Sequence, residues 1–431
     1  MPDVIISGAG PAGISAALEL VRGGRSVVVI EKAKFPRDKC CGDGLTTLAL
    51  RQYEALGFDP RQLNTWAEVR STVFCAPNGH QTRLQAPDND GIRIGVAKRE
   101  ELDAAFVAFA RTKGVEVREG LTITDITRSE HGVQATLSDG TTISGAYAIG
   151  ADGMWSPLRH LINNPSPADH GNDNHPDAKS PRYLGDIHAF RQYFEVTGKA
   201  REELWVWFEP DLLPGYVWSF PLGDGTANVG FGIERKPNES VSWMKDAWTD
   251  ILTRPHIAEV LGNIKPIGNH KAWPIPARIR SDLLSSFGGR VLYVGDAARV
   301  VDPLTGEGIG QAMETGHMAA VAIARGGVAN PRRTEQLYKR AIQSGIKIDN
   351  TFARSIAKLV TSQRMATTAI KLAPKGPWKG RYAFKWAFED NPRAALLTPW
   401  RYPKRFRNKR GAFLDTPNNP GNQNVRSNAK V

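Results

Sequence analysis

The chain opens with the stretch VIISGAGPAG at residues 4–13, and this stretch decides the fold. Its first four residues predict a buried strand, and the glycine-rich turn after them leads into an apolar helical run. A second apolar run, VVVIE at residues 27–31, predicts the next strand. The elements thus follow the order strand, glycine turn, helix, strand and closing acid. This order predicts a Rossmann-type βαβ unit.

The glycines and the acid of this unit each predict a contact. Gly8 permits the tight turn, Gly10 lets a pyrophosphate approach the backbone, and Gly13 lets the helix pack on the strand. The helix N-terminus offers N–H groups and the positive end of its dipole to the phosphates. Glu31 is placed to accept hydrogen bonds from ribose hydroxyls. The sequence therefore predicts a bound adenine dinucleotide, and this motif alone does not separate FAD from NAD.

Length and cysteine content set the general class. A chain of 431 residues is long enough for two or three folding units. Its three cysteines, Cys40, Cys41 and Cys75, form no disulfide framework and favour a reducing compartment, so we expect a cytoplasmic location. The apolar residues at the start of the sequence are predicted to form a strand, so no signal peptide is predicted. The sequence contains no run of about 18 apolar residues, so no membrane-spanning helix is predicted.

The net charge of +12 is concentrated near the C-terminus. Between Lys371 and Arg410 there are twelve Lys or Arg residues against Glu389 and Asp390, and aromatic residues interleave with them. This composition is typical of a contact with an anionic membrane surface or an anionic lipid. The other interpretation is a solvated basic tail whose aromatic residues cover the main domain. Nucleic-acid binding is disfavoured.

The loop after the second predicted strand, residues 35–45, is rich in glycine and charge. A loop in this position lies along an extended cofactor. Cys41 within it is either a reactive thiol near the redox centre or a small buried residue in a tight loop. A helix over 46–56 is predicted to follow, and Arg99 is predicted to open another over 100–113.

The middle of the chain predicts β-structure and one irregular insert. Residues 115–149 predict four strands joined by tight turns, interpreted as a single β-meander that ends in GADG at 150–153. Residues 163–182 are polar, with four prolines and no periodicity, and predict a surface loop or disordered insert. Histidines in and beside it match no common ligand spacing, so no metal site is predicted.

Aromatic residues alternate in the next part of the chain, in WVWFEP at 205–210 and YVWSFP at 216–221. Large rings at every second position of a strand pave one face of a sheet. Such a face suits a flat flavin or a long apolar ligand, and it equally suits a plain core.

A third glycine-rich motif follows the predicted strand at 291–294 and precedes a helix. Asp296, directly after this strand, is placed to hold polyol hydroxyls. The N–H groups near Gly308 and Ile309 are placed to stabilise an anion at the helix start. Reduced flavin carries such a charge at its N1 and O2 atoms.

These motifs resemble two nested groups of proteins. The glycine turn at 8–13, GADG at 150–153 and GDAA at 295–298 stand in the order shared by flavoproteins with the p-hydroxybenzoate hydroxylase type of fold, which favours FAD over NAD. CGDGL at 41–45 and the pattern Y-x-W-x-F-P at 216–221 further resemble the geranylgeranyl reductase family. The basic tail and the polar insert have no counterpart in this resemblance.

The resemblance implies a set of site residues. Its cofactor-binding members are Gly8, Gly10, Ala12, Gly13, Glu31, Lys32, Cys41, Gly42, Arg99, Asp152, Asp296, Gly306, Gly308 and Ile309. Its substrate-binding members are Tyr216, Trp218, Phe220 and Pro221. The catalytic candidates are Cys41, Tyr216 and Trp218.

The resemblance also implies an activity, the reduction of C=C bonds in an isoprenoid chain. The chain would be a geranylgeranyl group or the prenyl tail of menaquinone, with hydride from N5 of reduced FAD. NAD(P)H or a ferredoxin would supply the electrons. An FAD-dependent monooxygenase or halogenase acting on an aromatic or other small molecule shares the three FAD motifs and is the alternative.

The predicted fold class is α/β (α+β). A Rossmann-type FAD-binding domain with a β-meander is expected over residues 1–70, 95–160 and 285–365. An antiparallel-sheet substrate domain is expected over 71–94 and 180–284, and a basic helical C-terminal segment over 366–431. We expect association with the inner face of the membrane through residues 371–410.

Overall fold

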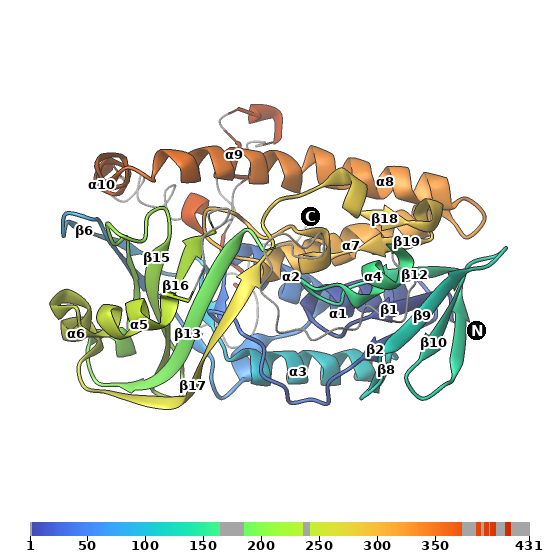
Figure 1. The fold of residues 1–431 in the computed structure, drawn as a ribbon, viewed down its shortest axis with the longest axis horizontal. Helices are drawn as coiled ribbons and strands as arrows, with labels where there is room; N and C mark the ends of the chain where they lie inside the picture. Colours follow the sequence, from blue (N-terminus) through green and yellow to red (C-terminus); the bar gives the residue numbers. More distant parts are fainter. Residues whose placement is uncertain are drawn as a thin grey trace, which may run out of the picture.

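The computed structural model describes residues 2–163, 185–235, 242–372, 385–388, 392–395, 397–401 and 410–414. Nearly all of the predicted insert at 163–182 and much of the basic segment at 371–410 lie outside the described residues. Two large sheets stand next to each other, and a run of helices extends along both (Figure 1).

The first large sheet carries the predicted βαβ unit. Its six strands follow the order β18 (Ser285–Ser286), β19 (Val291–Tyr293), β12 (Tyr147–Gly150), β1 (Val4–Ser7), β2 (Val27–Glu31) and β8 (Glu116–Glu119). All neighbours from β19 to β8 are parallel, and β18 is an antiparallel edge. Every residue of β2 is buried, as expected for a parallel strand covered on both faces.

Four helices accompany this sheet. They are α1 (Pro11–Arg22), α3 (Arg99–Thr112), α7 (Ile309–Gly326) and α8 (Pro331–Ser344). Gly8 has φ +101°, and a Cβ there would lie 2.4 Å from the Ala151 carbonyl oxygen. A Cβ at Gly13 would lie 2.0 Å from the Gly8 carbonyl oxygen. The turn and the close helix packing therefore require glycine at both positions, as predicted.

The β-meander is smaller than predicted. Only β9 (Ile123–Arg128), β10 (Val133–Leu137) and β11 (Thr142–Gly145) form it. The first predicted strand becomes β8 and pairs parallel with β2, because a strand that follows a crossover helix returns parallel to the strand before it. The last predicted strand divides at Ala146, and its second half joins the large sheet as β12, parallel to β1.

The second large sheet forms the other half of the molecule. Its seven strands follow the order β17 (Ile264–Ile275), β13 (Ile187–Val196), β16 (Thr226–Glu234), β15 (Tyr216–Pro221), β14 (Leu204–Trp207), β5 (Ser71–Cys75) and β6 (Gln81–Gln85). All neighbours are antiparallel except β14 and β5. Helices α5 (Met244–Thr253) and α6 (Pro255–Leu261) cover one face. Trp248 of α5 packs there against Phe190 and Phe231.

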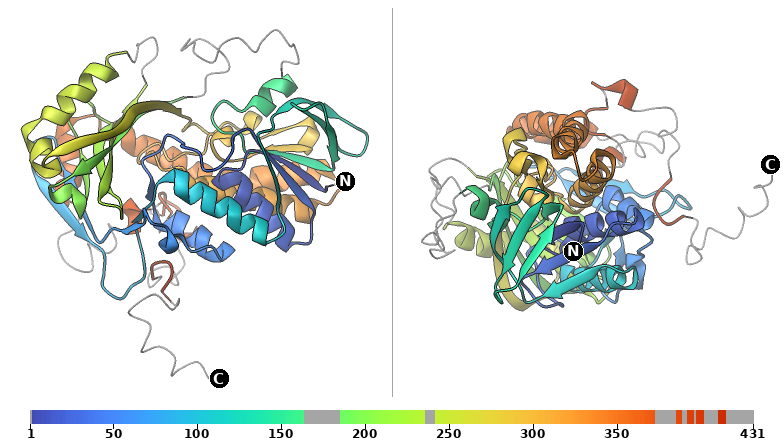
Figure 2. Two further views of the ribbon diagram at one scale, coloured as in Figure 1. Left: turned by 90° about the horizontal axis from the view of Figure 1, so that it is seen from below. Right: turned by 90° about the vertical axis from the view of Figure 1, so that its right-hand side faces the viewer.

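Smaller elements connect the two halves. A three-stranded sheet is built from β3 (Gly44–Leu45), β7 (Gly95–Val96) and β4 (Ala67–Glu68), and α2 (Thr47–Leu56) and α4 (Pro157–Asn163) lie beside the first sheet. Helices α9 (Ile346–Leu359) and α10 (Gln363–Leu372) continue from α8 toward the second sheet (Figures 1 and 2). None of the helices in the described residues is long and apolar enough to cross a membrane. The domain boundaries given above stay a prediction.

Candidate functional site

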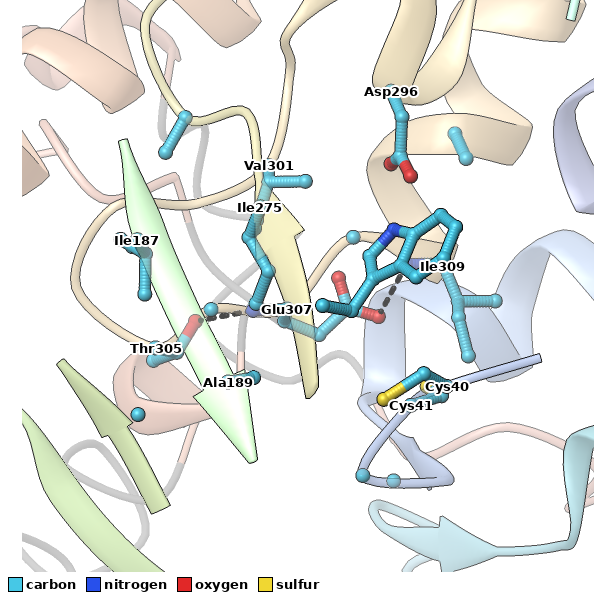
Figure 3. A pocket seen from close by; sticks show the side chains of 18 of the residues that line it. Cys40, Cys41, Ile187, Ala189, Ile275, Asp296, Val301, Thr305, Glu307 and Ile309 are labelled. Atoms are coloured by element: carbon cyan, nitrogen blue, oxygen red, sulfur yellow. Dashed lines mark hydrogen bonds between the residues drawn. The ribbon is translucent and has the colours of Figure 1, made fainter. Parts of the chain in front are cut away.

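A single continuous cavity of about 1170 Å³ lies between the two large sheets. One side is formed by Asp296, Ile309 and the loop of Cys40 and Cys41, as Figure 3 shows. Ile187 and Ala189 of β13 and Ile275 of β17 lie across from them. The predicted cofactor residues line this cavity, apart from Gly13, whose part is helix packing. The lining members are Gly8, Gly10, Ala12, Glu31, Lys32, Cys41, Gly42, Arg99, Asp152, Asp296, Gly306, Gly308 and Ile309.

The glycine turn and Glu31 form one end of the cavity. The Glu31 carboxylate is buried and accepts hydrogen bonds from the Ala9 N–H at 2.8 Å and the Ala33 N–H at 3.0 Å. It therefore fixes the turn to the end of β2. Its predicted contact with a ribose stays a prediction.

Arg37 is a site residue that the sequence analysis missed. A Cβ at Gly10 would lie 3.9 Å from the Arg37 guanidinium, so the cation faces the open side of the glycine turn. Arg37 Nη1 lies 3.2 Å from the Asp103 carboxylate, which also holds Arg99 through two hydrogen bonds of 2.8 and 2.7 Å. A cradle without side chains beside a helix N-terminus and a guanidinium fits a pyrophosphate. The residues present thus fit FAD, which supplies hydride chemistry when bound.

The start of α7 differs from the prediction. The Glu307 carboxylate accepts a hydrogen bond from the Ile309 N–H at 3.1 Å (Figure 3). It also accepts one from the Gly310 N–H at 3.0 Å. The predicted free N–H group at Ile309 is therefore already occupied by an acid two residues earlier, which caps the helix. Asp152 is similarly engaged, because its carboxylate accepts from Ser156 at 3.0 Å and from the Leu158 N–H at 2.8 Å.

The aromatic strands divide between the cavity and the core. Tyr216, Trp218 and Phe220 of β15 line the cavity together with Leu204, Val206 and Phe208 of β14 and its extension, and we call these six residues the aromatic wall. Trp205 and Trp207 lie on the other face, stacked at 5.7 Å in the core under α5. Pro221 does not line the cavity, because it follows the parity of Val217 and Ser219. The structure therefore gives no support to its predicted substrate contact.

Glycines give the Trp218 ring its place in the aromatic wall. Trp218 pairs with Gly230 across β15 and β16, where a Cβ would lie 2.4 Å from the indole. A Cβ at Gly42 would lie 3.3 Å from Phe220 and 3.6 Å from Trp218. The cysteine loop thus packs directly on the aromatic wall.

Burial disfavours the thiolate form of both cysteines of this loop. Burial raises the pKa of Cys40 to about 11 and also raises the pKa of Cys41. The Cys41 Sγ accepts a hydrogen bond from the Asp43 N–H at 3.3 Å. Since the thiolate is the nucleophile, neither residue is activated for nucleophilic attack.

The far end of the cavity lies under α9 and α10, where apolar side chains predominate and Arg354, Lys358 and Arg393 add positive charge. Ala357 and Val360 line it from the end of α9, and Ala366 and Ile370 from α10. Phe388, in one of the described C-terminal pieces, adds a ring that lies 6.4 Å from Phe74 of β5. A polar cradle that fits FAD at one end and a mainly apolar chamber at the other are typical of an FAD-dependent oxidoreductase.

Comparisons with known proteins agree with this class. The model of the FAD binding domain family matches residues 1–199. Menaquinone reductase of Mycolicibacterium smegmatis is 30% identical over 84% of this chain and 85% of its own length. Digeranylgeranylglycerophospholipid reductase 1 of Methanopyrus kandleri is 28% identical over 74% of this chain and 79% of its own. The chain belongs to the geranylgeranyl reductase family of FAD-dependent oxidoreductases.

A solved structure shares the fold. The geranylgeranyl bacteriochlorophyll reductase-like protein of Thermoplasma acidophilum superposes with a TM-score of 0.71 at 19% identity. The superposition covers 93% of this chain and 99% of the other. The predicted α/β fold with an FAD-binding unit and an antiparallel second sheet is thereby confirmed.

Proposed function

We propose that this protein reduces C=C bonds of an isoprenoid chain that lies in the apolar half of the cavity. The observation that carries the proposal is the aromatic wall, whose Tyr216, Trp218 and Phe220 rings face the cavity side by side at centroid distances of 6.0 and 6.1 Å. A prenyl chain is long, apolar and flexible, and such a surface binds it by area and not by hydrogen bonds.

The same wall supports the chemistry. An isolated alkene is not electron-poor, so a proton must reach one carbon as hydride reaches the other. Positive charge then develops on the more substituted carbon, and the faces of aromatic rings stabilise a cation. Trp218 is held for this role, because its indole N–H donates to the Asn228 side chain at 3.0 Å and fixes the ring.

The site residues have separate parts in this proposal. Gly8, Gly10, Glu31 and Arg37 hold the adenosine and pyrophosphate portion of FAD, since they form the cradle. Arg99, Asp152, Asp296, Gly306 and Gly308 line the cavity farther along and contact the remainder of the cofactor. NAD(P)H or a ferredoxin stays the expected electron donor.

The relatives support two substrate classes, a menaquinone tail and a digeranylgeranyl lipid. To separate them, the reduced protein is mixed under nitrogen with each lipid while the flavin spectrum and product masses are followed. Flavin reoxidation with a gain of two hydrogens in the prenyl chain of one lipid identifies the substrate, whereas a gain confined to the ring of menaquinone is reduction of the quinone. A flavin that stays reduced until air enters, followed by an oxygenated product, would instead support a monooxygenase.

We further propose that helices α9 and α10 contact the inner face of a membrane. They line one end of the cavity and expose Leu359 and Met365, at 52% and 46%, away from it, while Leu372, 72% exposed, lies at the cavity itself. Exposed basic residues lie beside these side chains, namely Lys358, Arg364 and Lys371. Apolar side chains among cations suit an anionic bilayer, from which a lipid substrate would enter the cavity.

A further inference from the structure

A line of buried polar groups reaches the cavity wall beside Cys41, and FAD binding does not account for it. Asp43 stands at its centre and is 0% exposed. One carboxylate oxygen accepts hydrogen bonds from the Tyr193 hydroxyl at 2.6 Å and from the Asn228 amide at 2.8 Å. The other accepts from the Arg99 N–H at 3.2 Å.

Tyr193 extends this line toward the surface. The tyrosine is half-buried and is not part of the cavity wall. The Lys98 ammonium lies 5.2 Å from the centre of its ring and pairs with Asp224 at 2.6 Å. Both members of that ion pair are partly exposed, with side-chain exposures of 20% and 31%. The phenol therefore stands between a surface ion pair and a buried carboxyl group.

We propose that Tyr193 and Asp43 form a proton line from the protein surface to the cavity wall at Cys41, where the alkene is protonated. The inference rests on the proposed reductase function, because that reaction consumes one proton per double bond. It assigns Tyr193 as a positioning residue, since this side chain does not line the cavity, whereas Asp43 belongs to the cavity wall beside Cys41. Cys41, which lies at the wall two residues before Asp43, is the group through which the proton enters the chamber.

The steps balance in protons and electrons. One alkene carbon gains hydride from the reduced flavin, and the other gains the proton of the Cys41 thiol, so that two C–H bonds form and the π bond breaks. The thiolate left behind takes the Asp43 proton across the cavity wall that both residues line. The Asp43 carboxylate takes the proton of the Tyr193 hydroxyl, which bonds it at 2.6 Å. Water at the surface returns a proton to Tyr193. The flavin alone is oxidised and the alkene alone is reduced.

The surroundings of Asp43 suit such a task. The groups that face it are Tyr193 and Arg191 of β13, Arg99 of α3, Asn228 of β16 and Cys41 of its own loop. Burial raises the pKa of Asp43 to about 6, although the hydrogen bonds from Tyr193 and Asn228 and the Arg191 charge act in the opposite direction. A group with a pKa near the working pH both takes and gives a proton readily.

A purely structural role for Asp43 is the competing explanation. Asn228 donates to the Cys41 carbonyl at 2.8 Å as well as to Asp43, and it accepts from Trp218. Asp43 therefore also ties the cysteine loop to the aromatic wall. A structural role predicts changes in stability and lipid binding, whereas a proton line predicts changes in pH profile and solvent isotope effect.

The test uses the FAD-loaded protein and the Tyr193→Phe variant, which removes one hydroxyl and keeps the ring. The matched control is Tyr147→Phe, because the Tyr147 hydroxyl bonds the Gly327 carbonyl at 2.6 Å away from the cavity. Tyr193→Phe is expected to keep its FAD and its Tm but to reduce the lipid about 100-fold more slowly near pH 8. The loss is smaller near pH 6, where more of the Asp43 carboxyls already hold a proton. The solvent isotope effect rises in this variant and not in the control.

A second measurement needs no substrate. Infrared difference spectra of the oxidised protein should show a carboxylic acid band that titrates near pH 6 and is absent from Asp43→Asn. The proton line is overturned if Tyr193→Phe has the rates, the pH profile and the isotope effect of the wild type. It is also overturned if the wild type lacks the carboxylic acid band. A wild type that has the band but reduces no lipid overturns the proposed function instead. If Asp43→Asn fails to fold, Tyr193→Phe alone decides.

Discussion

Val206 on β14 stands directly opposite Trp218 on β15, and both side chains line the cavity. Trp205, one residue earlier, pairs with Ser219 and turns its ring into the core on the other face. The alternation of a strand thus separates the aromatic wall from the aromatic core within two residues.

This division predicts opposite phenotypes for two tryptophans. Trp205→Ala should destabilise the protein by about 3–5 kcal/mol, because it removes a buried ring from the core. Trp218→Ala should retain more of the fold and lose most alkene reduction, because it removes the ring beside the substrate. Urea unfolding and anaerobic turnover measure the two effects. If activity falls in proportion to stability in the same way in both variants, Trp218 has no role separate from its contribution to the fold.

Asp296 tests the cofactor assignment. Asp296→Ala should yield protein without stoichiometric flavin, because the side chain lies in the cavity where the cofactor is expected. The control is Asp282→Ala, whose carboxylate is 60% exposed and pairs with Arg280. Flavin content of the purified proteins gives the answer, and a fully yellow Asp296→Ala protein would remove Asp296 from the site.

Arg37 tests the cradle that the structure adds to the glycine turn. Arg37→Met keeps much of the side-chain volume and removes the cation, so FAD affinity should fall by about 10- to 100-fold. Arg25→Met is the control, because Arg25 is one-third exposed and pairs with Asp3 far from the cavity wall. Binding of FAD to the apoprotein is followed by fluorescence. Unchanged affinity would place the pyrophosphate elsewhere.

The exposed side chains of α9 and α10 test the membrane contact. The double variant Leu359→Ser, Met365→Ser should bind anionic vesicles about tenfold more weakly, because it removes apolar side chains of the contact and leaves the cavity-lining Leu372 in place. Val328→Ser is the control, because Val328 is similarly apolar and 39% exposed. Vesicle binding should also weaken with salt. Sedimentation equal to that of the wild type would move the contact to another surface.

Local patterns made much of the fold and of the cofactor end predictable. The glycine turn, β2 and its closing acid are close in sequence, and each carries a local requirement: glycine at the turn, apolar side chains in the buried strand and a carboxylate at its end. The alternation of β15 likewise placed three rings on one face. It also implied that Pro221 would leave that face, which the motif-based assignment overlooked.

Other parts depend on contacts between distant segments. Strand β8 belongs to the parallel sheet through its pairing with β2, and the run of residues 115–119 does not carry that information. Arg37 joins the cradle only because its loop folds back over the glycine turn. Tyr193 and Asn228 meet Asp43 from two strands more than 100 residues away. Glu307 was overlooked as a cap, although its spacing before Ile309 is a visible signal.

The central claim is that the cavity reduces an alkene without oxygen, and one stoichiometric measurement tests it most directly. The protein is reduced, freed of oxygen and mixed, in separate samples, with menaquinone whose tail has a known number of double bonds and with digeranylgeranyl lipid. The account predicts one double bond lost, and two hydrogens gained, for each flavin reoxidised. The opposite result would contradict this claim: the flavin remains reduced, menaquinone and digeranylgeranyl lipid are unchanged, and oxygen is consumed when air enters.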